Sequence, residues 1–92
     1  MSDTDTYLLL YTYVPDMAER RGPYREEHLA RIKAEQDAGR VRLAGALGTP
    51  PTGGAIVFSG VTQDHIEQFT ATDPYVQAGL VTDQRIERWT LV

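Results

Sequence analysis

The chain has 92 residues and a mass of 10.3 kDa, enough for one domain, and its lack of cysteine excludes disulfides and thiolate metal sites. The net charge is −4, and the basic residues are scattered singly or in one pair, Arg20-Arg21, which argues against a nucleic-acid partner. The apolar runs are far too short to span a membrane, and the polar, acidic first residues differ from a signal peptide, so we expect a cytoplasmic protein.

A chain this short buries only part of its surface. Surface scaling gives a folded area of roughly 5,400 Å² against about 15,000 Å² for the unfolded chain, so about two thirds is buried. Domains of this size usually add a disulfide, a metal or a partner subunit. Because cysteine is absent and no histidine pair has metal-ligand spacing, a partner subunit is the remaining source of stability.

The first segments predict a tail and a strand. Residues 1–5 are polar and without periodicity, which predicts a mobile N-terminal tail ahead of a single domain over residues 6–92. Tyr7–Val14 has only one polar residue, Thr12, in eight positions and predicts a strand.

A loop and a long helix are expected next. Met17–Gly22 is charged and predicts a loop. Pro23–Ala38 predicts a helix, because proline favours the first helical turn and Gly39 suits a left-handed cap. At about 100° per residue, one face of this helix collects five side chains: Arg25, His28, Leu29, Ile32 and Gln36.

The middle of the chain predicts a hairpin and a second helix. Val41–Leu47 and Ala55–Phe58 are expected to pair as strands, and the Gly- and Pro-rich segment Gly48–Gly54 is expected to be their connecting loop. Thr62 is a suitable N-cap for a helix over Gln63–Ala71. The inward face of that helix is expected to comprise Ile66, Phe69 and Thr70.

The C-terminal part predicts a turn and a last strand. Asp73-Pro74 should end the second helix, and Tyr75–Gly79 should form a short turn or a single helical turn. Thr82–Val92 is expected to be the fourth strand, with Ile86, Trp89 and Leu91 as its apolar residues. The order βαββαβ predicts an α+β, ferredoxin-like fold, a four-stranded antiparallel sheet with two helices on one face.

The first strand is apolar on both of its faces. Its odd positions are Tyr7, Leu9, Tyr11 and Tyr13, and its even positions are Leu8, Leu10, Thr12 and Val14. In an antiparallel sheet with one solvent-exposed face, apolar and polar residues should alternate along each strand. The two helices of this fold cover only one face of the sheet. We therefore expect the second face to pack against another copy, in a homodimer or a larger homo-oligomer.

Two residues are candidates for acid–base chemistry. His28 lies on the sheet-facing side of the first helix, and the angular register of the second helix places Asp73 on its inward face. A carboxylate that accepts from one imidazole nitrogen would leave the other nitrogen as a base. The alternatives are a histidine bonded to a backbone carbonyl at the core edge and an Asp-Pro turn that only ends the helix.

The other candidates are less specific. Arg25 shares the face of His28 and could hold a substrate carboxylate, or it could be a surface arginine packed along the sheet edge. His65 is expected to be a solvated surface histidine. Gly45 and Gly79 are expected to serve backbone geometry. The sequence has no catalytic-triad motif, P-loop or dinucleotide fingerprint, so no cofactor is predicted.

Several stretches resemble one family in order and spacing. Over Tyr7–Trp89 the sequence is similar to the YciI-like (YCII-related) family, and the similar stretches are Arg25-Glu26-Glu27-His28-Leu29, Ala38-Gly39-Arg40, Leu43-Ala44-Gly45 and Asp73-Pro74-Tyr75-Val76-Gln77-Ala78-Gly79-Leu80. That family belongs to the dimeric α+β barrel superfamily, so the resemblance implies two ferredoxin-like sheets packed face to face. It also implies an active site centred on His28 and Asp73, with Arg25 in the Arg-x-x-His motif. The sequence has Gly45-Ala46 where many relatives have Gly-Pro, a difference in the loop beside the expected pocket.

Relatives in this family include a chloromuconolactone dehalogenase, and the superfamily includes muconolactone isomerases. The resulting hypothesis is a small cofactor-independent enzyme of lyase or isomerase type acting on a small carboxylated or lactone-type metabolite. His28, oriented by Asp73, would move the proton, and Arg25, Tyr75 and Gly45 are the candidate substrate-binding residues. The alternatives are a non-catalytic small-molecule-binding or accessory module and a structural subunit whose dimer surface is its function.

Overall fold

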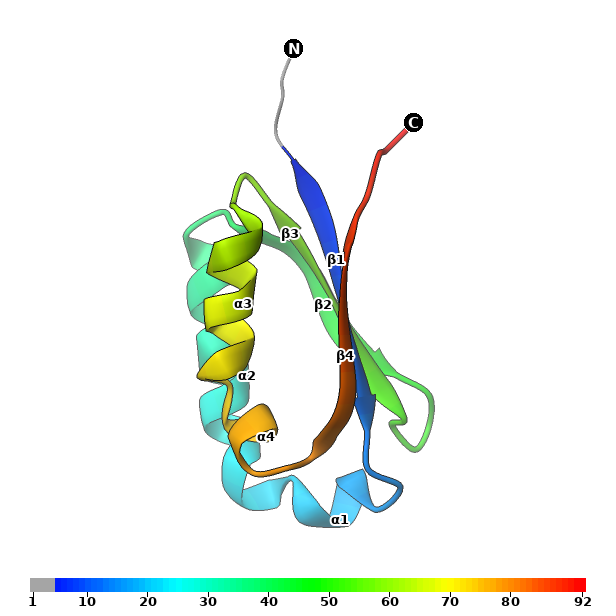
Figure 1. Ribbon diagram of the computed structural model, residues 1–92. Coiled ribbons are helices and arrows are strands. Elements are labelled where there is room, and N and C mark those ends of the chain that lie inside the picture. The colour runs from blue at the N-terminus through cyan, green and yellow to red at the C-terminus, as the bar shows by residue number, and fades with distance from the viewer. Residues whose placement is uncertain (1–4) are drawn as a thin grey trace.

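The computed structural model describes residues 5–92, in which a four-stranded antiparallel sheet carries its two long helices on one face (Figure 1). The strand order is β2-β3-β1-β4, so the predicted ferredoxin-like βαββαβ fold is confirmed. None of the helices in this part of the chain is long and apolar enough to cross a membrane. The elements are β1 (Thr6–Tyr13), α1 (Met17–Arg20), α2 (Gly22–Asp37), β2 (Val41–Leu47), β3 (Gly53–Ser59), α3 (Gln63–Ala71), α4 (Pro74–Gln77) and β4 (Val81–Arg88).

The core lies between the sheet and the helices and is built around the central strand β1. Leu9 is paired with Ile56 of β3 on one side and with Ile86 of β4 on the other, so its side chain lies in the middle of the helix-covered face. Phe58 and Ile66 are fully buried in the same cluster. Burying side chains of this size stabilises the fold by about 1.5–3 kcal/mol each.

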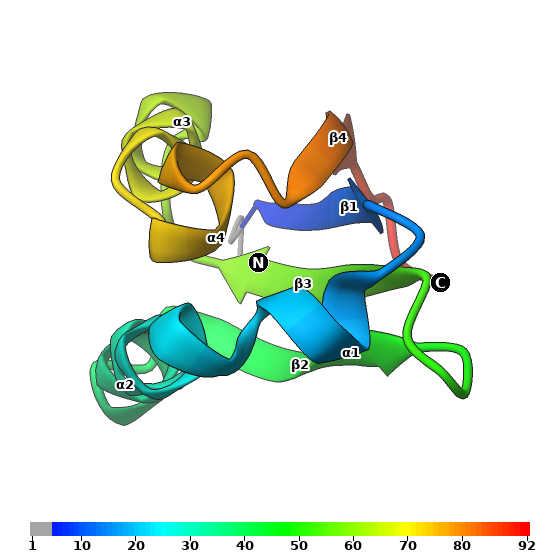
Figure 2. The same ribbon diagram turned by 90° about the horizontal axis from the view of Figure 1, so that it is seen from below.

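The segment that was expected to be a charged loop contains a short helix. Met17 is fully buried at the start of α1 and packs in a second apolar cluster with Val14, Tyr75 and Leu80. The prediction of a loop over Met17–Gly22 is therefore wrong, because one buried residue in a polar stretch produces no periodicity. Viewed from below, α1 crosses from the sheet to α2 and turns the chain into that helix (Figure 2).

The predicted bounds of the last two strands are also corrected. β3 begins at Gly53, inside the expected loop, because a Cβ at that position would lie 2.4 Å from the Tyr11 carbonyl oxygen and only glycine allows so close a pairing. β4 ends at Arg88. Trp89 still donates its backbone N–H to the Thr6 carbonyl, but its side chain is exposed.

The predicted helix ends agree with the structure. Gly39 has φ +80° directly after α2, as a left-handed cap requires, and α2 itself is displaced by one residue from the predicted bounds. The Thr62 hydroxyl accepts from the His65 backbone N–H at 3.2 Å, which confirms the N-cap of α3. Of the predicted tail, residues 1–4 lie outside the described residues, and the Asp5 carboxylate accepts from Arg88.

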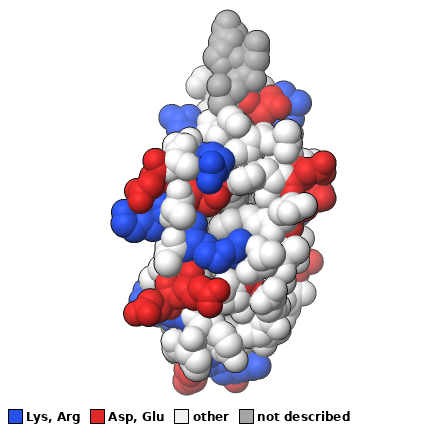
Figure 3. All heavy atoms as spheres, turned by 90° about the vertical axis from the view of Figure 1, so that its left-hand side faces the viewer, with Lys and Arg blue, Asp and Glu red and all other residues white. Residues whose placement is uncertain are grey.

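The helical face carries charges of both signs side by side (Figure 3). One cluster on it is partly buried and joins the end of α2 to the start of α3. The Glu35 carboxylate accepts two hydrogen bonds from Arg40, at 3.0 and 2.9 Å, and its Oε1 lies 2.7 Å from His65 Nε2. His65 was expected to be a solvated surface histidine; its side chain is 36% exposed, but it is held by Glu35 and has a structural role. Hydrogen bonding from Arg40 lowers the pKa of Glu35 against the opposing effect of burial, and His65 lowers it further.

We expect Glu35→Gln to lower the midpoint of thermal unfolding by several degrees at neutral pH and by less in acid. A carboxyl whose pKa is lower in the folded than in the unfolded chain stabilises the folded state above the unfolded pKa, and this contribution is lost as the pH falls through the folded pKa. Thermal unfolding of both proteins at neutral and acidic pH measures the difference. Asp37→Asn is the control, since its ion pair with Lys33 is exposed. A difference that grows in acid would contradict the assignment.

Candidate active site

The Asp73 carboxylate is completely buried and accepts from three parts of the fold. It is the N-cap of α4, where its Oδ1 accepts from the Tyr75 backbone N–H at 3.0 Å. The same oxygen lies 2.8 Å from His28 Nδ1, and Oδ2 accepts from the Tyr11 hydroxyl at 2.8 Å. A buried carboxylate is stable only when its lone pairs are satisfied in this way, so the three contacts fix the position of Asp73.

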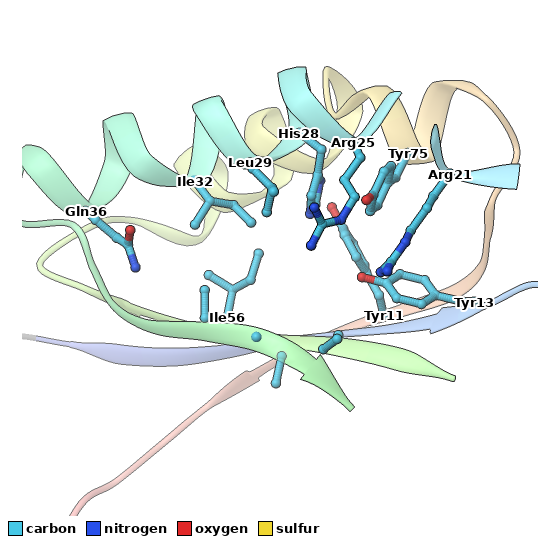
Figure 4. Close-up of a pocket in the computed structure, with 15 residues that line it drawn as sticks. Tyr11, Tyr13, Arg21, Arg25, His28, Leu29, Ile32, Gln36, Ile56 and Tyr75 are labelled. Carbon is cyan, nitrogen blue, oxygen red and sulfur yellow. The ribbon is translucent and has the colours of Figure 1, made fainter. Parts of the chain in front are cut away.

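These contacts also determine the orientation of the His28 ring. An ionised carboxylate only accepts hydrogen bonds, so His28 Nδ1 carries the hydrogen that lies between it and Asp73. In the neutral imidazole, Nε2 then holds the free lone pair, and His28 is one of the residues that line the cavity (Figure 4). The pair can therefore accept a proton at Nε2, and the carboxylate stabilises the resulting imidazolium.

His28 and Asp73 meet because each is in line with the buried side chains of a helix, α2 for His28 and α3 for Asp73. His28 and Ile32 are one turn apart and are the two buried residues of α2, as the predicted face requires. Asp73 follows the buried positions Phe69 and Thr70 of α3. The structure therefore brings His28 and Asp73 together as the sequence predicted, and it excludes the alternative in which His28 bonds only to a backbone carbonyl.

Tyr75 supports the histidine from the side. Its ring stacks on the His28 imidazole with centroids 3.8 Å apart and planes 11° apart, and Tyr13 meets the Tyr75 ring edge-on at 6.0 Å. The stacking restricts rotation of the imidazole, while the Tyr75 backbone holds Asp73. Tyr75 therefore both lines the cavity and positions the pair.

A cavity of about 300 Å³ opens beside this pair, between α2 and the β2–β3 hairpin (Figure 4). The five residues of the predicted α2 face all line it. Gly45 also lines it, and because this glycine has no positive φ and a Cβ would meet nothing within 4 Å, the structure does not support a role in backbone geometry. Gly79, by contrast, has φ +75°, as that role requires.

Among the cavity residues that the sequence did not indicate, three have polar or charged side chains: Tyr11, Tyr13 and Arg21. The alternation of β1 places both tyrosines on the helix-covered face, but their proximity to Asp73 follows only from the packing of α3 and α4. Burial, reinforced by the Asp73 charge, raises the pKa of Tyr11 far above its ordinary value. Burial, with the neighbouring Tyr75, raises the pKa of Tyr13 to about 12. Both hydroxyls therefore remain protonated donors at neutral pH.

Nothing in residues 5–92 groups three His, Cys, Asp or Glu side chains closely enough to hold a metal ion. The candidate site contributes one histidine and one carboxylate, and these two groups bond to each other.

The fold and this site define a class: a small ferredoxin-like α+β protein with a buried His–Asp pair at the mouth of a cavity. The chain belongs to the YCII-related family, since the YCII-related domain matches residues 6–90. An uncharacterised protein of Haemophilus influenzae is 30% identical over 86 residues, which cover 84% of this chain and 88% of the relative.

Two solved structures share the fold. The 5-chloro-2-hydroxyhydroquinone dehydrochlorinase TftG from Burkholderia phenoliruptrix AC1100, in complex with 2,5-dihydroxybenzoquinone, is 20% identical with a TM-score of 0.81, and the match covers 95% of each chain. An antibiotic biosynthesis monooxygenase-type protein from Bacteroides thetaiotaomicron is 16% identical with a TM-score of 0.60, and the match covers 97% of this chain and 90% of the other. At these identities the likeness shows the fold alone.

We expect Tyr11→Phe to lower the free energy of unfolding by about 1–2 kcal/mol, because it leaves one oxygen of a fully buried carboxylate without its donor. Urea unfolding measures the change. Tyr7→Phe is the matched control in the same strand, since the Tyr7 hydroxyl does not contact Asp73 and its loss should change stability by less than about 0.5 kcal/mol. Equal losses in the two variants would contradict a specific role for the bond.

Proposed function

We propose that this protein is a small cofactor-independent enzyme in which His28 and Asp73 carry out acid–base chemistry on a small carboxylated or lactone-type metabolite. The observation that carries the proposal is the buried pair itself, with Nδ1 held at 2.8 Å by the carboxylate and His28 among the residues that line the cavity. A histidine that only stabilised the core would not need a cavity beside it.

The proposed step is proton abstraction next to a carbonyl. His28 Nε2 takes the proton from a C–H bond, and the electrons of that bond move into the carbonyl to give an enolate. Return of the proton to another carbon gives an isomer of the substrate. Alternatively, the enolate expels a leaving group, such as chloride, from the neighbouring carbon, and a double bond forms in an elimination. Asp73 stabilises the imidazolium in either case, and Arg25, Tyr75 and Gly45 are the proposed substrate-binding residues.

The comparisons support this reaction class. A dehydrochlorinase removes a proton and a chloride, and TftG, which shares the fold, is in complex with a small oxygenated ring. The cavity of about 300 Å³ lies at the lower end of the volumes typical of ligand sites, which favours a ligand of similar size.

Exchange of substrate hydrogens in deuterated water tests the proposal without a known product. In a set of small carboxylic acids and lactones, together with 5-chloro-2-hydroxyhydroquinone, we expect the protein to accelerate deuterium incorporation or chloride release for at least one compound. His28→Gln should reduce that rate by about 10²–10⁴-fold, and Asp73→Asn should also reduce it. Proton NMR and chloride measurement follow the two reactions.

His65→Gln is the matched control and should keep the activity, because His65 bonds to Glu35 and does not line the cavity. Binding of a compound without exchange or turnover would favour the alternative, a non-catalytic small-molecule-binding module. Equal rates for the wild type and His28→Gln would overturn the role of the pair.

We also propose that two copies pack through the sheet face that the helices leave uncovered, on the right of Figure 1. The pairing register places the side chains of Leu10 and Ala55 together on this face, and those of Leu8, Val57 and Leu43 form the next row. Leu43 is 69% exposed in the single chain, although most of its neighbours in that row are apolar. Burying this surface in a homodimer would supply stability that a chain of this size lacks.

Sedimentation analysis at low micromolar concentration should find a dimer, and Leu43→Glu should weaken it at least about a hundredfold, because a symmetric interface loses the apolar contact twice. Tyr24→Glu is the control, since Tyr24 is a partly exposed residue of α2 on the opposite side of the sheet. A wild-type monomer at this concentration would overturn the proposal.

A further inference from the structure

Two arginines reach the cavity from the start of α2 without a carboxylate partner. Arg21 directly precedes α2 and Arg25 follows one turn later, and both point toward the sheet in Figure 4. Within residues 5–92, neither forms an ion pair with an acidic side chain. In contrast, four other arginines pair with carboxylates, and these are Arg20, Arg40, Arg85 and Arg88.

The charge near the cavity is opposite in sign to that of the whole chain. The chain has a net charge of −4, but no Asp or Glu lines the cavity. Its nearest carboxylate, Asp73, lies behind His28 and is already bonded to three donors. With His28 neutral, two guanidinium groups and one carboxylate leave a single positive charge. One anionic group on a ligand would neutralise it.

Apart from Gln36 of α2, the remainder of the cavity is lined mainly by apolar side chains and forms an apolar slot. Leu29 and Ile32 of α2 lie on one side, and Ala44 and Ala46 of β2 line the sheet side with Ile56. Small residues on the sheet leave room opposite the helix for a planar group.

Tyr13 offers a hydroxyl at the edge of this slot. The Tyr13 side chain directs its oxygen into the cavity in Figure 4. A Cβ at Gly54 would lie 2.6 Å from that oxygen, so glycine at this position leaves the space that the hydroxyl occupies. Because Tyr13 remains protonated at neutral pH, it offers a hydrogen-bond donor to an oxygen on the ligand.

We propose that the cavity selects a small planar monocarboxylate, with its carboxylate between Arg21 and Arg25, its ring in the apolar slot and a ring oxygen bonded to Tyr13. This inference rests on the proposed function and names the substrate class and two further specificity-determining residues, Arg21 and Tyr13. Arginines one turn apart have Cβ atoms about 6 Å apart, which allows both to reach a single carboxylate.

Benzoate and its neutral counterpart benzamide test the selection by NMR titration of the labelled protein. We expect benzoate to shift the amide signals around Arg21, Leu29 and Gly54 and to bind about tenfold or more tightly than benzamide. Arg21→Gln and Arg25→Gln should each remove most of this preference. Arg20→Gln is the matched control, because it removes the same charge from the adjacent position, where the side chain pairs with Asp16 outside the cavity, and it should keep the preference.

Tyr13 is tested with 3-hydroxybenzoate, whose binding advantage over benzoate should be lost in Tyr13→Phe. Equal affinity for benzoate and benzamide, absence of benzoate binding, or shifts confined to the outer face of the sheet would each overturn the proposal. The titration is repeated with His28→Gln, which should keep the preference for benzoate although it loses turnover. A result against the preference for benzoate is thereby distinguished from a result against the catalytic role of His28.

Discussion

The buried Asp73 carboxylate is the interaction on which the site depends. Its two oxygens receive the Tyr11 hydroxyl from the central strand, the His28 ring from α2 and the Tyr75 backbone from α4. Each bond offsets part of the cost of removing a carboxylate from water, and the loss of the Tyr11 hydroxyl would leave Oδ2 without a donor. The same contacts that connect the sheet to the helices also fix the His28 ring beside the cavity, so the stability of the fold and the proposed chemistry depend on one group.

The two ends of the helical layer have different roles. At one end, Glu35 joins α2 to α3 through Arg40 and His65, with every charge in the cluster paired. At the other end, Arg21 and Arg25 have no carboxylate partner among the described residues and line a cavity. Paired charges are already neutralised within the protein, whereas two unpaired guanidinium groups beside an apolar slot provide a site for an anion. This difference separates the structural histidine from the candidate catalytic one, although both lie beside a carboxylate.

Local signals determined what the sequence could predict. Proline and glycine at the ends of α2 and the Thr62 cap act within one helical turn, so the two long helices, α2 and α3, were predicted to within a residue. The angular register of these two helices was enough to pair His28 with Asp73. Met17 and Gly53 were misassigned because their structure depends on distant partners, an apolar cluster for the first and the Tyr11 carbonyl for the second. Tyr11 was missed as a site residue for the same reason, since it lies 62 positions from the carboxylate that it contacts.

The β2–β3 hairpin connects the cavity with the proposed dimer face. Successive residues of a strand point to opposite sides of a sheet, so Gly54 and Ile56 face the cavity while Ala55 and Val57 face the uncovered side. A shift of the hairpin register by one residue would exchange these two sets, which would fill the slot with the wrong side chains and place Ile56 in the outer face. A copy packed on that face would therefore hold the register that shapes the cavity. In the proposed dimer, this coupling gives a physical reason for the cavity and the packed face to share one hairpin.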